Sequence, residues 1–120
     1  MKILVVDDSR VMRQIVTRTL RQAGFGHHEV VEAGNGAEGI GAVRDEQPDL
    51  VLSDWNMPEM SGIEFLTALR AAGDTRTFGF VTSEGSEPMR AQAAAAGAAF
   101  LLAKPFTPET FRDVLEPVLG

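Results

Sequence analysis

The sequence has no cysteine among its 120 residues. This absence excludes disulfide bonds, thiolate zinc sites and cysteine nucleophiles. It is compatible with a reducing compartment, and we expect the protein to act in the cytoplasm.

Long apolar runs and an excess of basic charge are also lacking. No apolar run is long enough to span a bilayer, and Asp7 comes too early for a secretory signal peptide. The formal net charge of −6 at pH 7 argues against a nucleic acid or an anionic membrane as the main partner. We therefore expect neither DNA binding nor membrane insertion, and a cation or a basic protein surface fits this charge better.

Linkers, internal repeats and blocks of like charge are absent as well, which leaves the composition of a globular domain. Hydrophobic residues make up 44% of the chain and charged residues 23%, and these proportions argue against disorder. A chain of this length can bury a sizeable core. We expect one domain over residues 1–120, present as a monomer.

Short apolar runs recur along the chain, separated by helical patterns. The run before Asp54 is too short for a helix, and its leucine and valine residues suit a strand buried on both faces. Five strands are predicted in this way, at residues 3–6, 29–33, 49–54, 78–82 and 100–103.

Each predicted strand is followed by the start of a helix. Capping-box patterns open two of these helices, from Asn35 to Glu38 and from Ser61 to Glu64. The other starts are marked by Asp8 or Ser9, by Ser86 with Pro88, and by Thr107 with Pro108. Strict alternation of strands and helices predicts an α/β fold with a doubly wound, flavodoxin-like parallel sheet of five strands and five helices. Five strands are too few for a closed barrel.

Acidic, basic and hydroxyl side chains stand at the ends of four of these strands. They are Asp7 and Asp8, Asp54, Thr82 and Lys104. In an open parallel sheet the carboxyl ends of the strands meet at one edge, where ligands bind. Three carboxylates gathered there repel one another unless a cation neutralises them, and Mg²⁺ is the hard cation that suits oxygen ligands. Because no histidine or cysteine is near, zinc is not expected.

These groups together are typical of a site that accepts a phosphoryl group. A carboxylate is ionised at neutral pH and needs no general base, so Asp54, alone at the middle strand, is the predicted nucleophile. Asp7 and Asp8 are the predicted metal pair, while Lys104 and Thr82 would contact the phosphoryl oxygens. Taken singly, Asp8 is also explained as a helix cap, Thr82 as an ordinary strand residue, and Lys104 as a solvated turn residue.

Four short segments carry the motifs of a known family: Val5–Ser9, Ser53–Pro58, Val81–Glu84 and Lys104–Phe106. Through them the chain resembles the receiver domains of two-component response regulators over essentially its whole length. Among these it is most similar to the single-domain receivers of chemotaxis.

The resemblance implies a phosphorylation-activated switch rather than an enzyme. Asp54 would accept the phosphoryl group from a phosphohistidine on a sensor histidine kinase or a phosphotransfer protein. Lys104 would pair with that group, and Thr82 would move toward it and signal the change. The Lys104–Pro105 peptide bond would be cis, which is frequent in this family.

The resemblance also implies a metal site built from four residues. Asp8 and Asp54 would bind Mg²⁺ through their side chains and Asp7 through water. Asn56 would contribute its backbone carbonyl.

One position departs from the family's pattern. An aromatic residue usually stands three positions before the lysine, where this chain has Leu101, with Phe100 one residue earlier. Neighbouring residues on a strand point to opposite faces, so Phe100 cannot replace that aromatic unless a bulge shifts the register. The departure leaves the phosphorylation chemistry unchanged and affects how a movement of Thr82 is passed to the surface around Leu101.

Three side chains lie beside the predicted site. Asn56 and Glu84 lie two positions after Asp54 and Thr82, where they would line the mouth of the site and tune attack by water on the acyl phosphate. Trp55 is expected to be a partly exposed loop residue whose fluorescence reports the binding of metal or phosphate.

No output domain follows Gly120 in this sequence, so we expect the phosphorylated chain to dock to a partner. The expected docking surface covers roughly Ser86–Leu119. A phosphorelay intermediate, or a receiver fragment of a larger response regulator, is the alternative.

Two other classes of protein share parts of this pattern. A haloacid-dehalogenase-type hydrolase is disfavoured because Asp7 and Asp8 are adjacent, whereas that family has an Asp-x-Asp motif. A flavodoxin-like flavin carrier is disfavoured because Ser9–Met12 is not a loop rich in hydroxyl groups and glycine.

Overall fold

A computed structural model describes residues 1–119, and Gly120, the last residue of the predicted domain, lies outside the described residues. Five parallel strands form one sheet in the order β2-β1-β3-β4-β5. The strands are β1 (Lys2–Val6), β2 (Glu29–Ala33), β3 (Leu50–Ser53), β4 (Thr77–Thr82) and β5 (Phe100–Ala103). The helices are α1 (Arg10–Leu20), α2 (Gly36–Glu46), α3 (Gly62–Ala71), α4 (Glu87–Ala96) and α5 (Pro108–Leu119), with a π-helical turn, η1 (Arg21–Phe25), after α1. The predicted fold is confirmed.

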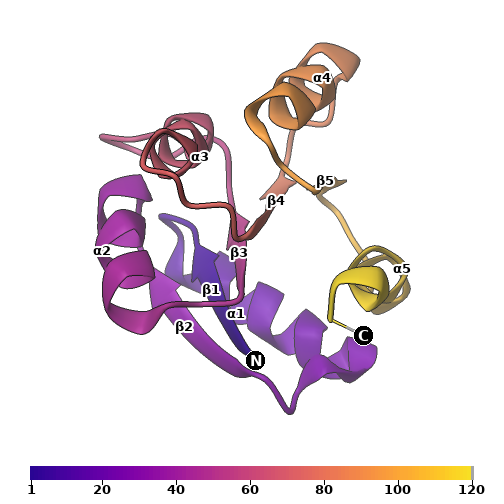
Figure 1. Ribbon diagram of the computed structural model, residues 1–120. Coiled ribbons are helices and arrows are strands. Elements are labelled where there is room, and N and C mark those ends of the chain that lie inside the picture. Colours follow the sequence, from indigo (N-terminus) through magenta and orange to yellow (C-terminus); the bar gives the residue numbers. More distant parts are fainter. Residues whose placement is uncertain (120) are drawn as a thin grey trace.

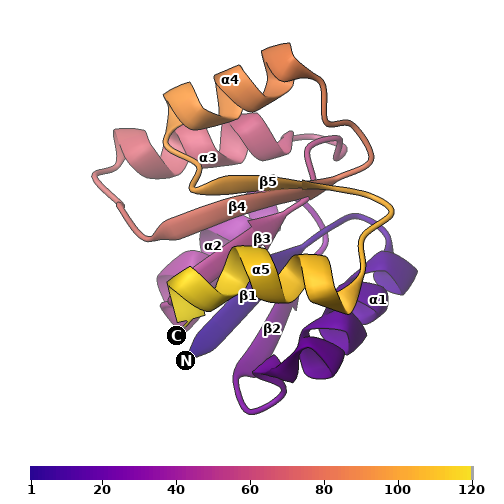
Figure 2. The same cartoon turned by 90° about the vertical axis from the view of Figure 1, so that its right-hand side faces the viewer.

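Helices cover both faces of the sheet, with α1 and α5 on one face and α2, α3 and α4 on the other (Figure 1). Both ends of the described chain lie at the edge of the sheet where the strands begin (Figure 2). The loops that follow the strands therefore gather at the opposite edge. Among residues 1–119, no helix is long and apolar enough to cross a membrane.

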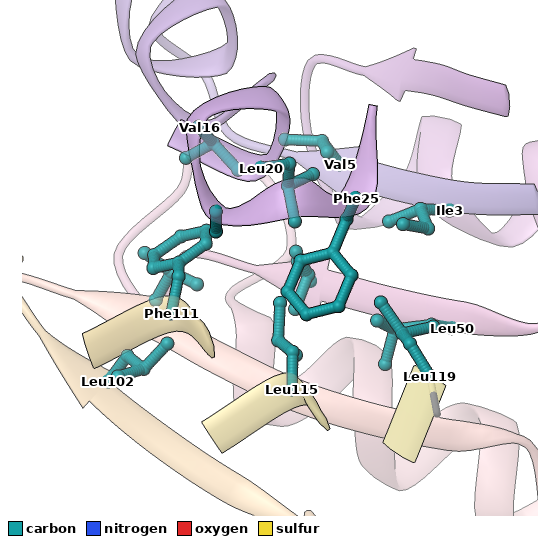
Figure 3. Packing of buried hydrophobic residues seen from close by; sticks show 13 residues of the cluster. Ile3, Val5, Val16, Leu20, Phe25, Leu50, Leu102, Phe111, Leu115 and Leu119 are labelled. Carbon is teal, nitrogen blue, oxygen red and sulfur yellow. The ribbon is translucent and has the colours of Figure 1, made fainter. Parts of the chain in front are cut away.

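The core beneath α1 and α5 is aliphatic with two phenylalanines (Figure 3). Phe111 and Leu115 of α5 are fully buried and meet Leu20 of α1 above the sheet. Burying each such side chain stabilises the fold by about 1.5–3 kcal/mol. The apolar face predicted for the last helix is thus the face that packs.

The core on the other face is aromatic. The rings of Phe65 and Phe78 lie 5.3 Å apart between their centroids, those of Phe78 and Phe80 lie 5.2 Å apart, and both pairs meet edge to face. The ring centroid of Trp55 lies 4.7 Å from that of Phe80, and Trp55 is only 8% exposed. The prediction of a partly exposed Trp55 is therefore wrong, because the loop after β3 folds the indole back onto this cluster.

The helix starts follow the capping residues of the sequence. Ser61 and Glu64 form the reciprocal capping box at the start of α3. At α2, Asn35 accepts from the Glu38 N–H, but the Glu38 carboxylate accepts from the Gly34 N–H instead of the cap's own amide. The second capping box is therefore only half formed.

Candidate functional site

Three carboxylates meet at the carboxyl edge of the sheet. Asp7, Asp8 and Asp54 each place an oxygen within 4.8 Å of the others. They converge because β1 and β3 are neighbours, with Val6 opposite Ser53, and the Asp54 N–H continues the ladder to the Val6 carbonyl at 2.9 Å. The predicted acidic cluster is present.

Lys104 reaches across the sheet from the end of β5 to this cluster. Its Nζ lies 3.4 Å from Asp7 Oδ2 and 3.6 Å from Asp54 Oδ2. Its backbone N–H donates to the Thr82 carbonyl at 2.7 Å, and the Lys104–Pro105 peptide bond is cis, as the resemblance implied. One ammonium group thus faces two carboxylates, which leaves the cluster with net negative charge.

Asp7 is the most buried member of the cluster, with 3% exposure. Burial raises the pKa of Asp7, and the neighbouring Asp54 acts in the same direction. The Ser9 N–H, which donates to Asp7 Oδ1 at 2.9 Å, and the Lys104 ammonium lower the pKa and oppose that rise. Charge at Asp7 is therefore costly without a further cation.

Asp54 is held so that one carboxylate oxygen faces the cluster. Its Oδ1 accepts from the Trp55 N–H at 2.7 Å, while its Oδ2 faces Lys104. Its carbonyl accepts from Ser53 Oγ at 2.8 Å. The same carbonyl lies against Gly62, where an added Cβ would come within 2.1 Å of it. The start of α3 thus fixes the backbone of Asp54.

Thr82 and Asn56 stand at the same edge as the cluster. Thr82 is fully buried at the end of β4, and its Oγ1 accepts from the Glu84 N–H at 3.4 Å. Asn56 is exposed, and its Nδ2 donates to Glu84 Oε1 at 3.2 Å. This bond joins the loop after β3 to the loop after β4 at the mouth of the site.

Arg13 is a supporting residue that the sequence patterns did not reveal. Its Nη1 donates to the Asp7 carbonyl at 2.6 Å, and its Nε to Glu32 Oε1 at 2.7 Å. Arg13 lies one turn after the cap Ser9, but its contact with Asp7 depends on how α1 crosses β1. Nothing in the residue pattern alone signals that crossing.

The departure at Leu101 leaves the strand register unchanged. The β4–β5 ladder is regular, with Gly79 opposite Phe100 and Phe80 opposite Leu101. Leu101 joins the aromatic core beneath α4, whereas Phe100 packs on the α1 and α5 side. A Cβ at Gly79 would lie 2.1 Å from the Phe100 ring. The prediction that Phe100 cannot take the place of the family's aromatic is confirmed.

The cluster suits a hard divalent cation. Its ligand atoms are carboxylate oxygens alone, its three members lie within 4.8 Å, and Lys104 compensates only part of their charge. Mg²⁺ binds through one or two carboxylates and keeps several waters, so the exposed side of the cluster at Asp8 fits it.

Comparison with known proteins identifies the class to which this fold and this acidic edge belong. The family model of the response regulator receiver domain matches residues 3–116, and the chain belongs to that family. It is 40% identical over 123 residues to the chemotaxis protein CheY homolog of Campylobacter jejuni, covering 100% of this chain and 93% of the relative. It is 38% identical over 121 residues to the probable chemotaxis protein CheY of Rhizobium etli, covering 99% and 92%.

A solved structure agrees with these relatives. Chemotaxis response regulator CheY4 of Vibrio cholerae superposes with a TM-score of 0.84 at 38% identity, over 98% of this chain and 97% of that one. The chain is thus a CheY-like receiver, whose family works in phosphorylation-dependent two-component signalling. Receivers of this kind are signalling switches rather than classical enzymes, and they interact with histidine kinases and downstream targets.

Proposed function

We propose that the chain, as one receiver domain over residues 1–120, is a chemotaxis-type switch that is phosphorylated on Asp54. The observation that carries the proposal is the position of Asp54, which belongs to the acidic cluster and places its Oδ2 3.6 Å from Lys104 Nζ. Asp7 Oδ2 also lies near this ammonium group, at 3.4 Å, but the Asp7 side chain is only 5% exposed, against 13% for Asp54. Asp54 is therefore the more accessible nucleophile beside the fixed cation.

The phosphoryl donor is a phosphohistidine on a sensor kinase or phosphotransfer protein. An Asp54 oxygen forms a bond to phosphorus, the bond from phosphorus to the imidazole nitrogen breaks, and the departing nitrogen keeps the electron pair. Lys104 Nζ offsets the charge of the phosphoryl oxygens, and the Thr82 hydroxyl donates to one of them.

Mg²⁺ held by Asp7, Asp8, Asp54 and the Asn56 carbonyl would supply the positive charge that lets an anionic phosphoryl group approach the acidic edge. The donor approaches past an apolar pocket beside the site. Met12, Ile15, Lys104, Pro105 and Phe106 line this pocket. An apolar surface next to Lys104, at the mouth of the site, supports a protein donor over a free metabolite.

The phosphorylated chain binds its target through the surface formed by Ser86–Leu119. Phosphorylation replaces the single negative charge of the Asp54 carboxylate by the about 1.5 to 2 negative charges of a phosphoryl group. This change reorganises Thr82 and Lys104. Thr82 ends β4, from which a short loop leads to α4, and Lys104 directly follows β5 within this range. Both residues therefore connect the site to this surface.

Intact-protein mass spectrometry after incubation with acetyl phosphate tests the proposal. We expect one added phosphoryl group in the wild type with Mg²⁺, and none after chelation or in Asp54→Asn. Asp45→Asn is the matched control, because Asp45 is an exposed carboxylate outside the cluster. Labelling that persists in Asp54→Asn would contradict the assignment of the nucleophile.

A further inference from the structure

Arg90 of α4 hydrogen-bonds two segments that flank its helix. Its Nε donates to the Gly85 carbonyl at 3.2 Å, and its Nη1 donates to the Leu101 carbonyl at 3.1 Å. Gly85 belongs to the loop between β4 and α4, and Leu101 belongs to β5. One guanidinium therefore joins this loop to the strand beside it.

The Leu101 carbonyl lies on the free edge of the sheet. Lys104 donates its N–H to Thr82 of β4, and alternate residues of a parallel strand bond on the same side. Leu101, three residues before Lys104, therefore points its main-chain groups away from β4. Since β5 is the last strand of the sheet, Arg90 bonds a carbonyl that has no strand partner among residues 1–119.

The loop before α4 also lies directly against β5. A Cβ added at Gly85 would come within 3.1 Å of Ala103 Cβ and 3.8 Å of Leu101 Cδ2. The loop can lie this close to β5 because Gly85 has no side chain. A movement of the loop away from β5 stretches the bond from Arg90 to the Gly85 carbonyl.

The same loop is connected to the buried hydroxyl at the site. The Glu84 N–H donates to Thr82 Oγ1, a bond that lies one residue before Gly85. When the Thr82 hydroxyl turns to donate to an oxygen on Asp54, its lone pairs turn away from Glu84. The loop then loses that local hydrogen bond, and Arg90 remains as the side chain that holds Gly85 to β5.

We propose that Arg90 is a positioning residue that stabilises the unphosphorylated position of the loop between β4 and α4. The proposal rests on phosphorylation of Asp54. Because the link ends on a main-chain carbonyl, it requires no aromatic side chain at position 101. Removing the guanidinium shifts the equilibrium of the loop toward the position adopted when a phosphoryl group is bound.

Titration with beryllofluoride, a phosphoryl mimic, in the presence of Mg²⁺ tests this role, with Trp55 fluorescence as the signal. Arg90→Met keeps the unbranched stem and removes both hydrogen bonds. We expect it to bind beryllofluoride about fivefold more tightly than the wild type. This is the factor for one net hydrogen bond, because the loop movement breaks only the bond to Gly85 in the wild type. Arg90→Lys can reach one carbonyl at a time and should shift in the same direction by less.

Arg70→Met is the matched control. Arg70 donates to the carbonyls of Asp74 at 3.0 Å and Gly97 at 2.8 Å, at the far end of α4 from the site. Its loss should leave beryllofluoride affinity unchanged. The affinity for Mg²⁺ alone should be the same in all four proteins, whereas a general loosening of the fold would change it.

The two proposals fail in different ways. A wild type that binds no beryllofluoride overturns the role of Asp54 and this inference with it. A wild type that binds, with Arg90→Met equal or weaker, overturns the role of Arg90 alone. A tighter Arg90→Met together with an equally tighter Arg70→Met overturns it too, because the effect would then belong to α4 as a whole.

Discussion

Arg76 directly precedes β4, at the edge of the sheet where the strands begin, and its side chain donates several hydrogen bonds. Its Nε donates to both oxygens of Asp74, at 2.8 and 2.9 Å. Its Nη1 donates to the Pro48 carbonyl at 2.8 Å, and its Nη2 to Gln47 Oε1 at 3.3 Å. The pair thus ties the loop before β4 to the connection between α2 and β3.

Replacing Asp74 tests this pair at the scale of one residue. Arg76 lowers the pKa of Asp74 below its usual 3.8. The ionised carboxylate therefore stabilises the fold fully above pH 3.8. This stabilisation is lost as the pH falls through the lowered pKa of Asp74 in the folded protein. Asp74→Asn should reduce the free energy of unfolding at pH 7 by about 1–2 kcal/mol. Urea unfolding should show a smaller difference in the free energy of unfolding between Asp74→Asn and the wild type below pH 3.8 than at pH 7.

The control for Asp74→Asn is Asp45→Asn. Asp45 pairs with Arg44 at 3.2 Å, but both side chains are well exposed, at 66% and 75%. Such a pair contributes little, so the variant should match the wild type at both pH values. An Asp74→Asn protein as stable as Asp45→Asn at pH 7 would contradict the structural role of this half-buried pair.

Individual residues of the site differ in how far the sequence predicts them. Asp54 and Lys104 could be placed at one edge because each directly follows a strand, and parallel strands end together. The burial of Trp55 and the contact of Arg13 with Asp7 could not be predicted. Both depend on how a loop or a helix packs on its neighbours, and no periodic pattern in the sequence indicates that packing.

Helix α3 begins in direct contact with the site, and its first residue decides how close it can come. An added Cβ at Gly62 would lie 2.1 Å from the Asp54 carbonyl oxygen and 2.8 Å from the Phe80 ring. Gly62 also donates its N–H to the Trp55 carbonyl at 2.8 Å. The helix can dock here only because this residue has no side chain.

Gly62→Ala should therefore destabilise the fold by at least about 2 kcal/mol, because backbone atoms would have to move apart. Gly41→Ala, within α2, is the matched substitution in open space, where the nearest atom is Arg44 Nη2 at 3.7 Å. It should stabilise the protein by about 0.5–1 kcal/mol through helix propensity. The urea concentration at the unfolding midpoint should fall in Gly62→Ala and rise in Gly41→Ala. A Gly62→Ala protein as stable as the wild type would show that α3 can move away from Asp54.

Element types follow from the sequence more reliably than element ends. The Ser61 and Glu64 pattern predicts the start of α3 correctly, since both partners are local. The similar pattern at Asn35 and Glu38 is only half formed, because the Gly34 N–H competes for the carboxylate. The π-helical turn at Arg21–Phe25 was not predicted, since Gly24, with φ of +99°, signals only where the helix stops.

The molecule as a whole is acidic, with a formal net charge of −6, and three of its carboxylates meet at one edge. Mg²⁺ bound there should stabilise the folded chain, because the unfolded chain has no such cluster. At a free concentration of a hundred times its dissociation constant the gain is about 2.7 kcal/mol.

Thermal unfolding with Mg²⁺ and with a chelator measures this gain. The midpoint should rise with Mg²⁺ in the wild type, and the rise should largely disappear in Asp8→Asn. Asp113→Asn on the exposed face of α5 changes the net charge equally and should keep the response. An equal response in both variants would indicate general charge screening in place of a site.

Strand β5 closes one side of the sheet, and the outer strand of any sheet can recruit a strand from another molecule. An incoming strand needs the outward carbonyls of β5 as acceptors, and Arg90 already occupies that of Leu101. To join there, the foreign backbone would have to displace a guanidinium and approach a charged side chain. The same arginine therefore protects the sheet against edge-to-edge aggregation, a hazard that rises with protein concentration.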